Sequence, residues 1–555
     1  MARFRAGACV SAIGVLAVLA AVSSASAATI TGDPGATCGG LAGAAPDAVR
    51  IDSATLQSPS PIALAERGAT PVSRITPANP VFCKVLGRIE PTDPNAPPIL
   101  FQVNLPVEWN GRSLQYGGGG FNGVLTTGLG LPPAYPFDKA SPLARGFVTY
   151  GTDSGHEAKP GEPPQIFALN AEAFENFAHR SYKKVRDAAV ALMVRAYGKA
   201  PDKMYFMGSS EGGREGLTMA QRYPDDFDGI LARVPVINWV GLMHVEVRSG
   251  LVTMGDGWIR PTQVKLVADA VREACDKADG SVDLLVEDPV GCKATFKPET
   301  LRCAEGQQDD RCLTEAQIKA INALHSPLKF SFPLANGLDD YPGWGVSGED
   351  NPSFGPTGGW TSWWLGTSAP AQPPVPGNGI SWVYGSGAIQ YVFARNPRLD
   401  VTTYKPEDYK ERVLEVSQLM DSTNPDLSRF RARGGRLIIF EHMADYAQSP
   451  HAGIRYFENV QHKLGKAETA EFARLYTAPG ADHVGSGAPA NIDMLSVLVD
   501  WVEKGQAPGD LEVTEQKVEA PSFAVIRALP LCQWPAWPHY KSGPVNASSS
   551  FFCAP

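Results

Sequence analysis

The chain has 555 residues, of which 43% are hydrophobic and 19% are charged, a composition typical of a folded globular protein and not of a disordered one. Its formal net charge is −9 and no basic block accompanies it, which excludes the usual features of nucleic-acid-binding proteins and of proteins that bind anionic membranes. The length is enough for one large elaborated domain or for two domains.

The first 27 residues have the pattern of a secretory signal peptide. Arg3 and Arg5 precede an apolar run over 6–22, and the small residues at 25–27 suit signal peptidase. A retained membrane anchor is the alternative, but the run is short, and no later stretch is long and apolar enough to span a bilayer. We therefore predict cleavage after Ala27 and a mature protein that is secreted or periplasmic.

The cysteines agree with export. One of the nine, Cys9, leaves with the signal peptide, and an even number in the mature part of an exported chain suggests four disulfides. The number of cysteines alone does not fix the pairing. Close spacing favours Cys275–Cys292, Cys303–Cys312 and Cys532–Cys553, which leaves Cys38–Cys83. No CxxC pair or histidine-rich cluster indicates zinc or redox chemistry.

From residue 28 to 235 the pattern alternates between strands and helices. The region up to about 110 is rich in Pro and Ala, and four consecutive glycines stand at 117–120. Apolar residues at helical spacing predict a helix that Gly198 ends. The predicted elements, in order, are strands 99–105 and 147–150, helix 181–197, strand 204–207, a sharp turn at 208–213 and helix 214–221. This alternation is typical of a parallel α/β sheet.

The composition and the sequence pattern change between residues 236 and 432. This stretch holds four of the mature cysteines, seven tryptophans, an acidic loop at 276–288 and Pro/Gly-rich runs over 351–380. The α/β pattern then resumes, with strands 436–440 and 472–477 and helix 492–504. We predict an α/β catalytic domain built from residues 28–235 and 433–555, interrupted by a lid domain over 236–432.

A nucleophile motif lies in the turn at 208–213. Gly208-Ser209-Ser210-Glu211-Gly212 satisfies G-x-S-x-G, in which flanking glycines allow a tight strand-to-helix turn that raises one hydroxyl above the sheet. An ordinary glycine turn is the alternative. The position of the motif after a buried strand and before a helix favours the interpretation that Ser210 is a nucleophile.

A serine nucleophile of this type needs an acid and then a histidine further along the chain, each after a strand. Asp445 follows strand 436–440 and His483 follows strand 472–477. His442 is the second candidate for the base. The oxyanion of acyl transfer needs two N–H donors, for which Glu211 and the glycines at 117–120 are the natural sources.

Two features of the stretch 236–432 have competing interpretations. Three carboxylates within 276–283 suit a hard cation such as Ca²⁺, but a solvated acidic turn is the alternative. The tryptophans suit either a plain apolar core or a lid over an aromatic substrate.

Taken together, these residues resemble the tannase and feruloyl esterase family. The matching stretches are 109–112, 117–123, 152–156, 208–217, 227–230, 362–366 and 479–483. The resemblance implies an α/β-hydrolase fold with a large lid inserted between nucleophile and acid. It also implies hydrolysis of the ester bonds of hydroxycinnamates, gallates or related aromatic acids, with no organic cofactor.

The resemblance assigns roles to individual residues. Ser210, Asp445 and His483 fall on the catalytic triad, Gly120 and Glu211 on the oxyanion donors, and Trp363 on a lid tryptophan that stacks on the substrate ring. The four disulfides named above match the family pairings. A structural Ca²⁺ site in the lid falls on Asp276, Asp279, Ser281, Asp283 and Leu285, with Ser281 and Leu285 acting through their carbonyls.

The chain also departs from the family pattern. Ser209 and Val484 stand where two cysteines usually join the nucleophile to the histidine loop, and Leu284 replaces a glycine of the calcium loop. Glu441 and His442 stand where a His-Gly pair is usual. Relatives that bind a substrate carboxylate use a lid arginine, whereas residues 365–394 contain no Arg or Lys.

We therefore predict a serine esterase for neutral aromatic esters, such as feruloyl-type or bis-hydroxyethyl esters. Two other classes are compatible with the sequence: a non-catalytic protein that binds aromatic ligands on the same fold, and a cell-surface module held by calcium and disulfides. The oligomeric state is not indicated by the sequence.

Overall fold

A computed structural model describes residues 27–43, 48–60, 64–65, 75–307, 309–352, 358–518 and 522–555. The predicted signal peptide lies outside these ranges apart from its last residue. No helix within them is long and apolar enough to cross a bilayer.

A mixed sheet of nine strands organises the described chain, in the order β15-β14-β11-β10-β8-β9-β6-β5-β2. The six strands from β15 to β9 are parallel, and the last three, β6, β5 and β2, continue the sheet antiparallel. Their bounds are β2 Val49–Gln57, β5 Phe82–Ile89, β6 Ile99–Pro106, β8 Arg112–Tyr116, β9 Val148–Thr152, β10 Lys203–Ser209, β11 Gly229–Arg233, β14 Arg436–His442 and β15 Ala473–Ala478.

Helices cover both faces of this sheet, because alternate strand residues point to opposite sides. Ile439 packs in the apolar layer that includes α3 (Ser181–Tyr197), α4 (Glu211–Arg222) and α12 (Pro450–Leu464). Its neighbour Ile438 packs in the layer that includes α14 (Met494–Lys504). The parallel strands are therefore buried on both faces, as their continuous apolar runs indicate.

The predicted elements agree closely with the structure. Helix 181–197 is α3, which ends at Gly198 with a left-handed φ of 74°. The strand predicted at 204–207 is the centre of β10, and the helix predicted at 214–221 starts earlier, directly after Ser210. The structure adds β2, β5, β8 and β11, which the sequence analysis did not assign.

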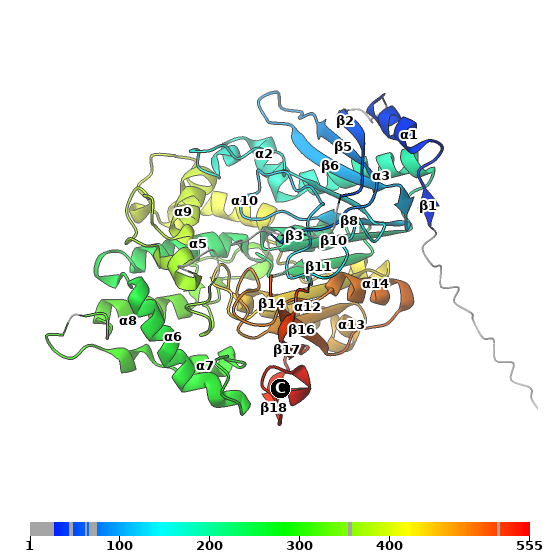
Figure 1. Ribbon diagram of the computed structural model, residues 1–555. Helices are drawn as coiled ribbons and strands as arrows, with labels where there is room; N and C mark the ends of the chain where they lie inside the picture. The colour runs from blue at the N-terminus through cyan, green and yellow to red at the C-terminus, as the bar shows by residue number, and fades with distance from the viewer. Residues whose placement is uncertain are drawn as a thin grey trace, which may run out of the picture.

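The segment between β11 and β14 adds no strand to the main sheet in its described part, although these two strands are neighbours. It forms the helical group drawn green to yellow beside the sheet in Figure 1. We call residues 234–435 the inserted segment. Its helices and short strands are α5 Trp239–Val252, α6 Pro261–Cys275, α7 Pro289–Thr295, α8 Glu315–His325, β12 Leu328–Lys329, β13 Asp340–Tyr341, α9 Ile380–Gly387, α10 Lys410–Met420 and α11 Ser428–Ala432.

The remaining elements lie at the ends of the chain and at loop edges. Two C-terminal hairpins pair β16 with β17 and β18 with β19. The bounds are β1 Ala28–Thr29, α1 Pro34–Gly40, β3 Leu64–Ala65, β4 Ile75–Thr76, β7 Glu108–Trp109, α2 Ala171–Glu175, α13 Lys466–Ala470, β16 Leu511–Gln516, β17 Val525–Leu531, β18 Trp537–Tyr540 and β19 Phe551–Ala554.

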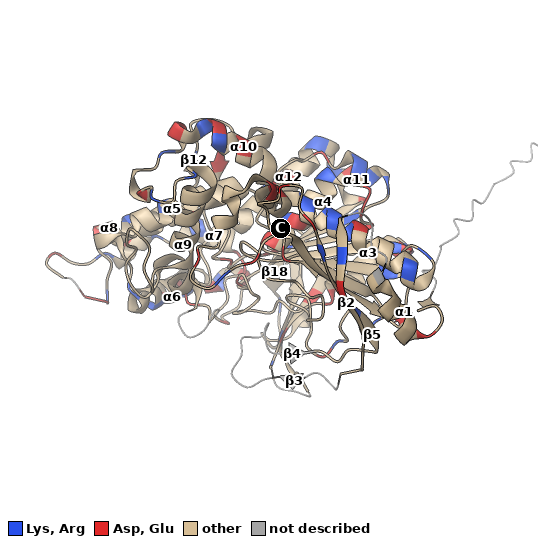
Figure 2. Ribbon diagram, turned by 90° about the horizontal axis from the view of Figure 1, so that it is seen from above, with Lys and Arg blue, Asp and Glu red and all other residues tan. Residues whose placement is uncertain are grey.

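Charged residues of both signs alternate in some places, and the basic residues of α3 and α11 include some with acidic partners, such as Asp187 for Lys183 and Glu471 for Arg431. In Figure 2 blue and red segments alternate along α10, whose sequence carries Lys410, Glu411, Arg412 and Glu415. This distribution fits the net charge of −9.

All four predicted disulfides are present. They join Cys38 to Cys83, Cys275 to Cys292, Cys303 to Cys312 and Cys532 to Cys553. Two of them lie within the inserted segment, and the last joins the end of β17 to β19.

Candidate active site

Ser210 occupies the sharp turn between β10 and α4. Its backbone has φ 62° and ψ −123°, a region that L-residues rarely adopt and that functional sites often retain. A Cβ on Gly208 would lie 2.1 Å from the Gly212 carbonyl oxygen, and one on Gly212 would lie 2.6 Å from that of Gly118. Glycine is therefore required on both sides of Ser210, which is the physical content of the G-x-S-x-G pattern.

Asp445 and His483 come from the loops after neighbouring parallel strands, β14 and β15, so their side chains meet at one sheet edge. The His483 Nδ1 lies 2.7 Å from Asp445 Oδ2, and the carboxylate is buried. Asp445 Oδ1 also accepts hydrogen bonds from the backbone N–H groups of Ala447 (2.7 Å) and Gln448 (3.1 Å). These bonds fix the carboxylate, which in turn orients the imidazole.

A cavity of about 310 Å³ opens between the sheet edge and the inserted segment. Ser210, His483, Gly120, Glu211 and Trp363 all line it, so the structure brings five of the sequence-predicted site residues to one space. The centre of the Trp363 indole lies 6.1 Å from that of the His483 ring. Other lining residues are mainly apolar, among them Phe121, Val236, Trp239, Leu242, Met243 and Tyr384.

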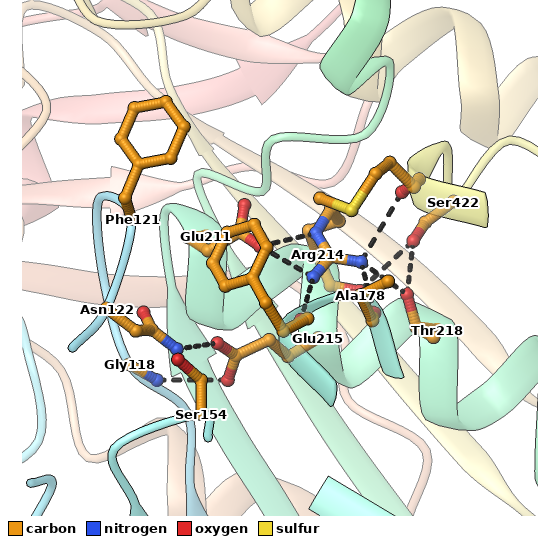
Figure 3. A network of polar contacts seen from close by, with 12 residues as sticks. Gly118, Phe121, Asn122, Ser154, Ala178, Glu211, Arg214, Glu215, Thr218 and Ser422 are labelled. Atoms are coloured by element: carbon orange, nitrogen blue, oxygen red, sulfur yellow. Dashed lines mark hydrogen bonds and ion pairs between the residues drawn. The ribbon is translucent and has the colours of Figure 1, made fainter. Parts of the chain in front are cut away.

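The glycine loop at 117–120 is held against α4 by a carboxylate. Glu215 accepts hydrogen bonds from the Gly118 N–H (3.0 Å) and from Asn122 Nδ2 (2.7 Å), as Figure 3 shows. Gly120 has φ 59° and lies beside the Tyr384 hydroxyl. In the described part of the chain its N–H donates to no protein group, so it remains available to an oxyanion.

His156 holds the same loop from the other side. Its Nε2 lies 2.9 Å from the Phe121 carbonyl oxygen, and its ring stacks on Phe167 at 3.6 Å between centres. Burial lowers the pKa of His156 to about 4, so the ring is neutral and donates its Nε2 proton to that carbonyl. The family-matching stretch 152–156 therefore acts by positioning the loop.

A buried arginine of α4 pairs with an acid of the same helix and bonds to more distant parts of the chain. Arg214 Nε donates to Glu211 Oε1 at 2.6 Å, and another nitrogen donates to the Ala178 carbonyl (Figure 3). Its guanidinium also donates to the carbonyls of Phe177 and Met420. Met420 belongs to the inserted segment. The helix that follows Ser210 is thereby bonded directly to the inserted segment.

Arg233, at the end of β11, is a cavity residue that the sequence analysis missed. Its guanidinium donates to the Ser209 hydroxyl (2.7 Å), to the His483 carbonyl (3.1 Å) and to His442 Nε2 (3.3 Å). The side chain is buried, and burial lowers its pKa to about 10. A single charged residue at the end of an apolar strand, Gly229-Ile230-Leu231-Ala232-Arg233, was the signal available in the sequence.

His442, the second candidate for the base, lies outside the lining of the cavity. Its Nδ1 lies 2.6 Å from the Asp482 carbonyl oxygen, and Nε2 accepts from Arg233, which fixes a neutral tautomer. Burial and the Arg233 charge hold the pKa of His442 well below its usual range. Both nitrogens are occupied, so this ring supports the histidine loop.

The calcium loop carries the expected acidic residues, but their carboxylates are engaged with the protein. Asp276 accepts from the N–H groups of Asp283 and Leu284, Asp279 accepts from Ser281, and Asp283 pairs with Arg527. Leu284 has φ 69°, a conformation that favours glycine. In the described residues no group of three or more His, Cys, Asp or Glu side chains is arranged to hold a metal ion.

One acidic group beside this loop has no partner. Glu287 is buried, neither of its carboxyl oxygens makes a hydrogen bond, and burial together with Asp283 and Asp279 raises its pKa to about 9. The carboxylate oxygens of this loop are therefore the ligand type that a hard cation such as Ca²⁺ prefers, but the side chains are not arranged around a common point that could hold the ion.

The strand order, the strained serine turn and the acid–histidine pair at the carboxyl edge of the sheet define an α/β-hydrolase. An esterase and feruloyl esterase B, both from Aspergillus oryzae, share this fold with TM-scores of 0.78 and 0.77 at 24% identity. Each alignment covers 94% of this chain and all of the other.

The chain belongs to the tannase and feruloyl esterase family, whose model matches residues 83–554, and it is a carboxylic-ester hydrolase. It is 34% identical to an uncharacterised esterase of Agrobacterium fabrum, over 93% of both chains. It is 32% identical to the mono(2-hydroxyethyl) terephthalate hydrolase of Piscinibacter sakaiensis, over 88% of this chain and 87% of the other. A probable feruloyl esterase of Arthroderma benhamiae is 32% identical over 81% of each.

Proposed function

We propose that this protein is an exported serine esterase that hydrolyses neutral aromatic esters through a covalent acyl-enzyme. The observation that carries the proposal is the 2.7 Å contact between His483 and Asp445, on a histidine that lines the same cavity as Ser210. A serine hydroxyl is a weak nucleophile and needs such an oriented base.

In the proposed mechanism, Ser210 attacks the ester carbonyl while His483 accepts its proton, and Asp445 stabilises the imidazolium that forms. The N–H groups of Gly120 and Glu211 bind the oxyanion. His483 then gives the proton to the departing alcohol. A water molecule, deprotonated in turn by His483, releases the acid and restores Ser210.

The substrate class follows from the wall of the cavity. Trp239, Trp363 and Phe121 offer flat apolar surface for an aromatic acyl group. Arg233 is a cation in this wall, but each of its nitrogens already bonds a protein group, so it does not provide a free partner for a substrate carboxylate. We therefore retain the prediction of a neutral ester, with Trp363 stacking on its ring.

Three further parts of the proposal rest on the sequence as well. Export is supported by the signal-peptide pattern and by the four disulfides. The lid role of residues 236–432 is supported by the lining residues that this stretch supplies. A structural Ca²⁺ held by the loop at Asp276, Asp279, Ser281, Asp283 and Leu285 is supported by the unpartnered Glu287 carboxyl beside it.

The nucleophile is tested with Ser210→Ala. We expect a folded protein whose turnover of a nitrophenyl ester falls by about 10⁴-fold or more. Labelling by a serine-reactive fluorophosphonate should occur in the parent protein and disappear in the variant. Normal turnover in Ser210→Ala would refute the assignment.

A panel of methyl ferulate, methyl gallate and the bis- and mono-hydroxyethyl esters of terephthalic acid tests the substrate class. Faster turnover of the mono-acid than of the neutral esters would overturn the proposed preference.

A further inference from the structure

A buried carboxyl group that makes no hydrogen bond of normal length faces the cavity from α5. Trp239, Leu242, Met243 and Glu246 all line the cavity, at the i, i+3, i+4, i+7 spacing of one helix face. Three members of this stripe are apolar, and the fourth is an acid that is 1% exposed. The position of Glu246 on this face directs its side chain toward the substrate space.

In the described residues the Trp363 side chain is at most a weak donor to this carboxyl group. Neither Oε1 nor Oε2 of Glu246 makes a hydrogen bond of normal length, although the nearby Trp363 side chain favours its ionised form to some extent. An unsatisfied buried polar group costs about 1–3 kcal/mol, and an ionised one costs more. Burial raises the pKa of Glu246 well above its usual range, so the group is a neutral carboxylic acid.

A neutral carboxylic acid both donates and accepts a hydrogen bond. A hydroxyl group has the same two capacities, so it can satisfy Glu246 completely without bringing a charge into the cavity. A carboxylate on the substrate would place a second acidic group beside Glu246, and the Arg233 nitrogens already bond protein groups.

The distance along α5 suits the far end of an extended acyl group. The segment that leads into α5 is bonded to the turn at Ser210, because the Val236 N–H donates to the Ser210 carbonyl at 3.1 Å. Glu246 lies seven residues beyond Trp239, or about 10 Å along the helix axis. A hydroxyl in the para position of an aromatic acyl group is therefore the substituent best placed to meet it.

We propose that Glu246 is a specificity-determining residue that hydrogen-bonds a hydroxyl on the aromatic ring of the acyl group and disfavours acyl groups with a carboxylate there. This inference rests on the proposed function, because it assumes that the acyl group enters this cavity.

The test measures binding without turnover, in the full chain carrying Ser210→Ala. Quenching of tryptophan fluorescence is followed with methyl 4-hydroxycinnamate, methyl cinnamate, methyl 4-carboxycinnamate and a methyl ester with a 4-aminomethyl group. We expect the hydroxylated ester to bind about 10-fold more tightly than methyl cinnamate, the difference that one satisfied hydrogen bond provides. The carboxylated ester should bind more weakly than methyl cinnamate.

Substitutions at residue 246 then separate recognition from folding. Glu246→Leu continues the apolar stripe and should reduce the 10-fold preference to less than 2-fold, while Glu246→Gln, which also donates and accepts, should keep most of it. Glu349→Gln is the matched control, because Glu349 is another buried acid of the inserted segment that lies outside this cavity. It should leave the preference unchanged.

Two results would overturn the inference: an unchanged preference in a folded Glu246→Leu protein, or tightest binding of the aminomethyl ester, which would show an ionised carboxylate. Turnover in the parent enzyme distinguishes this failure from failure of the proposed function. If the enzyme hydrolyses all four esters without preference, the proposed function stands and the inference about Glu246 is wrong. If the protein binds the hydroxylated ester selectively through Glu246 but hydrolyses none of the esters, the inference stands and the proposed function is wrong.

Discussion

Arg233 and His483 are joined by a hydrogen bond of 3.1 Å, from the guanidinium Nη2 to the backbone carbonyl of the histidine. The same guanidinium bonds the hydroxyl of Ser209, the residue before Ser210. One side chain from β11 therefore connects the serine turn to the histidine loop, two parts of the chain that are distant in sequence. Ser209 and Val484, where the family resemblance implies a disulfide, both lie in the wall of the same cavity.

We predict that Arg233→Ala lowers kcat by about 10- to 100-fold with a small effect on KM, because small displacements of reacting groups have effects of this size. It should also reduce the free energy of unfolding by about 1–3 kcal/mol, since the half-buried Ser209 hydroxyl and the buried His442 ring lose their partner. Steady-state kinetics and urea denaturation measure the two effects. Arg474→Ala, on strand β15 of the same sheet and outside the cavity, is the control, and equal losses in both variants would contradict the prediction.

Ser209→Cys combined with Val484→Cys extends this test within the Arg233→Ala protein. A disulfide between these positions would close a loop of about 275 residues, for which chain entropy gives a stabilisation of up to about 5 kcal/mol. We expect oxidation to restore part of the lost activity and a reducing agent to remove it again. If the oxidised protein gains stability but no activity, Arg233 does not act by holding the two loops together.

Local signals allowed much of this structure to be predicted from sequence. The apolar spacing of 181–197 and Gly198 gave both ends of α3, and the glycines around Ser210 gave the turn. The antiparallel strands β2, at the sheet edge, and β5, next to it, were not assigned, because both are less completely buried than β10 and have weaker apolar runs.

Partners that are distant in sequence could not be predicted. Arg233 bonds groups 24, 209 and 250 residues away, and Glu215 bonds Asn122 across 93 residues. The role of Glu246 depends on a cavity formed by several elements, so a single acid in an apolar helix was the only sign of it in the sequence.

Glu215 provides the second prediction. Its two carboxylate oxygens accept from Gly118 and Asn122, whereas a glutamine offers one oxygen and turns an NH₂ toward the other donor. Glu215→Gln should therefore displace the glycine loop and lower kcat by about 10-fold or more with little change in KM, because the proposed oxyanion contact of the Gly120 N–H forms mainly in the transition state. Glu175→Gln, at a less buried acid, should leave kcat unchanged. A matching rise in KM in Glu215→Gln would instead indicate a role in substrate binding.

Asp153 predicts a pH dependence of stability. It accepts from the Leu100 and Gly155 N–H groups through Oδ1, its Oδ2 has no partner, and burial raises its pKa to about 7. Between its ordinary pKa of 3.8 and about 7 the unfolded chain loses a proton that the folded chain keeps. Its contribution to stability is therefore lost as pH rises through this window and is constant above it.

Asp153→Asn keeps the Oδ1 acceptor and removes the titration. We expect the free energy of unfolding, measured with urea at pH 4.5 and pH 7.5, to fall by a few kcal/mol more in the parent protein than in the variant. The difference between the pH dependences of the two proteins gives the contribution of Asp153 to stability, separately from that of the other buried acids. Parallel pH profiles would show that Asp153 is ionised in the folded protein.

Removal of Ca²⁺ is the last prediction. If the loop at 276–285 holds the ion, dialysis against EDTA should lower the melting temperature, since a ligand present at about 100 times its Kd stabilises the folded state by about 2.7 kcal/mol. Added Ca²⁺ should reverse the change. Asp279→Ala should abolish the response to EDTA, whereas Asp269→Ala, on the exposed face of α6, should retain it.

Binding of Ca²⁺ requires the loop side chains to leave their present partners, and Asp283 in particular has to leave Arg527. Arg527→Gln should therefore raise the affinity for Ca²⁺ in a calorimetric titration. An EDTA-treated protein with an unchanged melting temperature and no heat of Ca²⁺ binding would mean that Arg527 has taken the place of the ion.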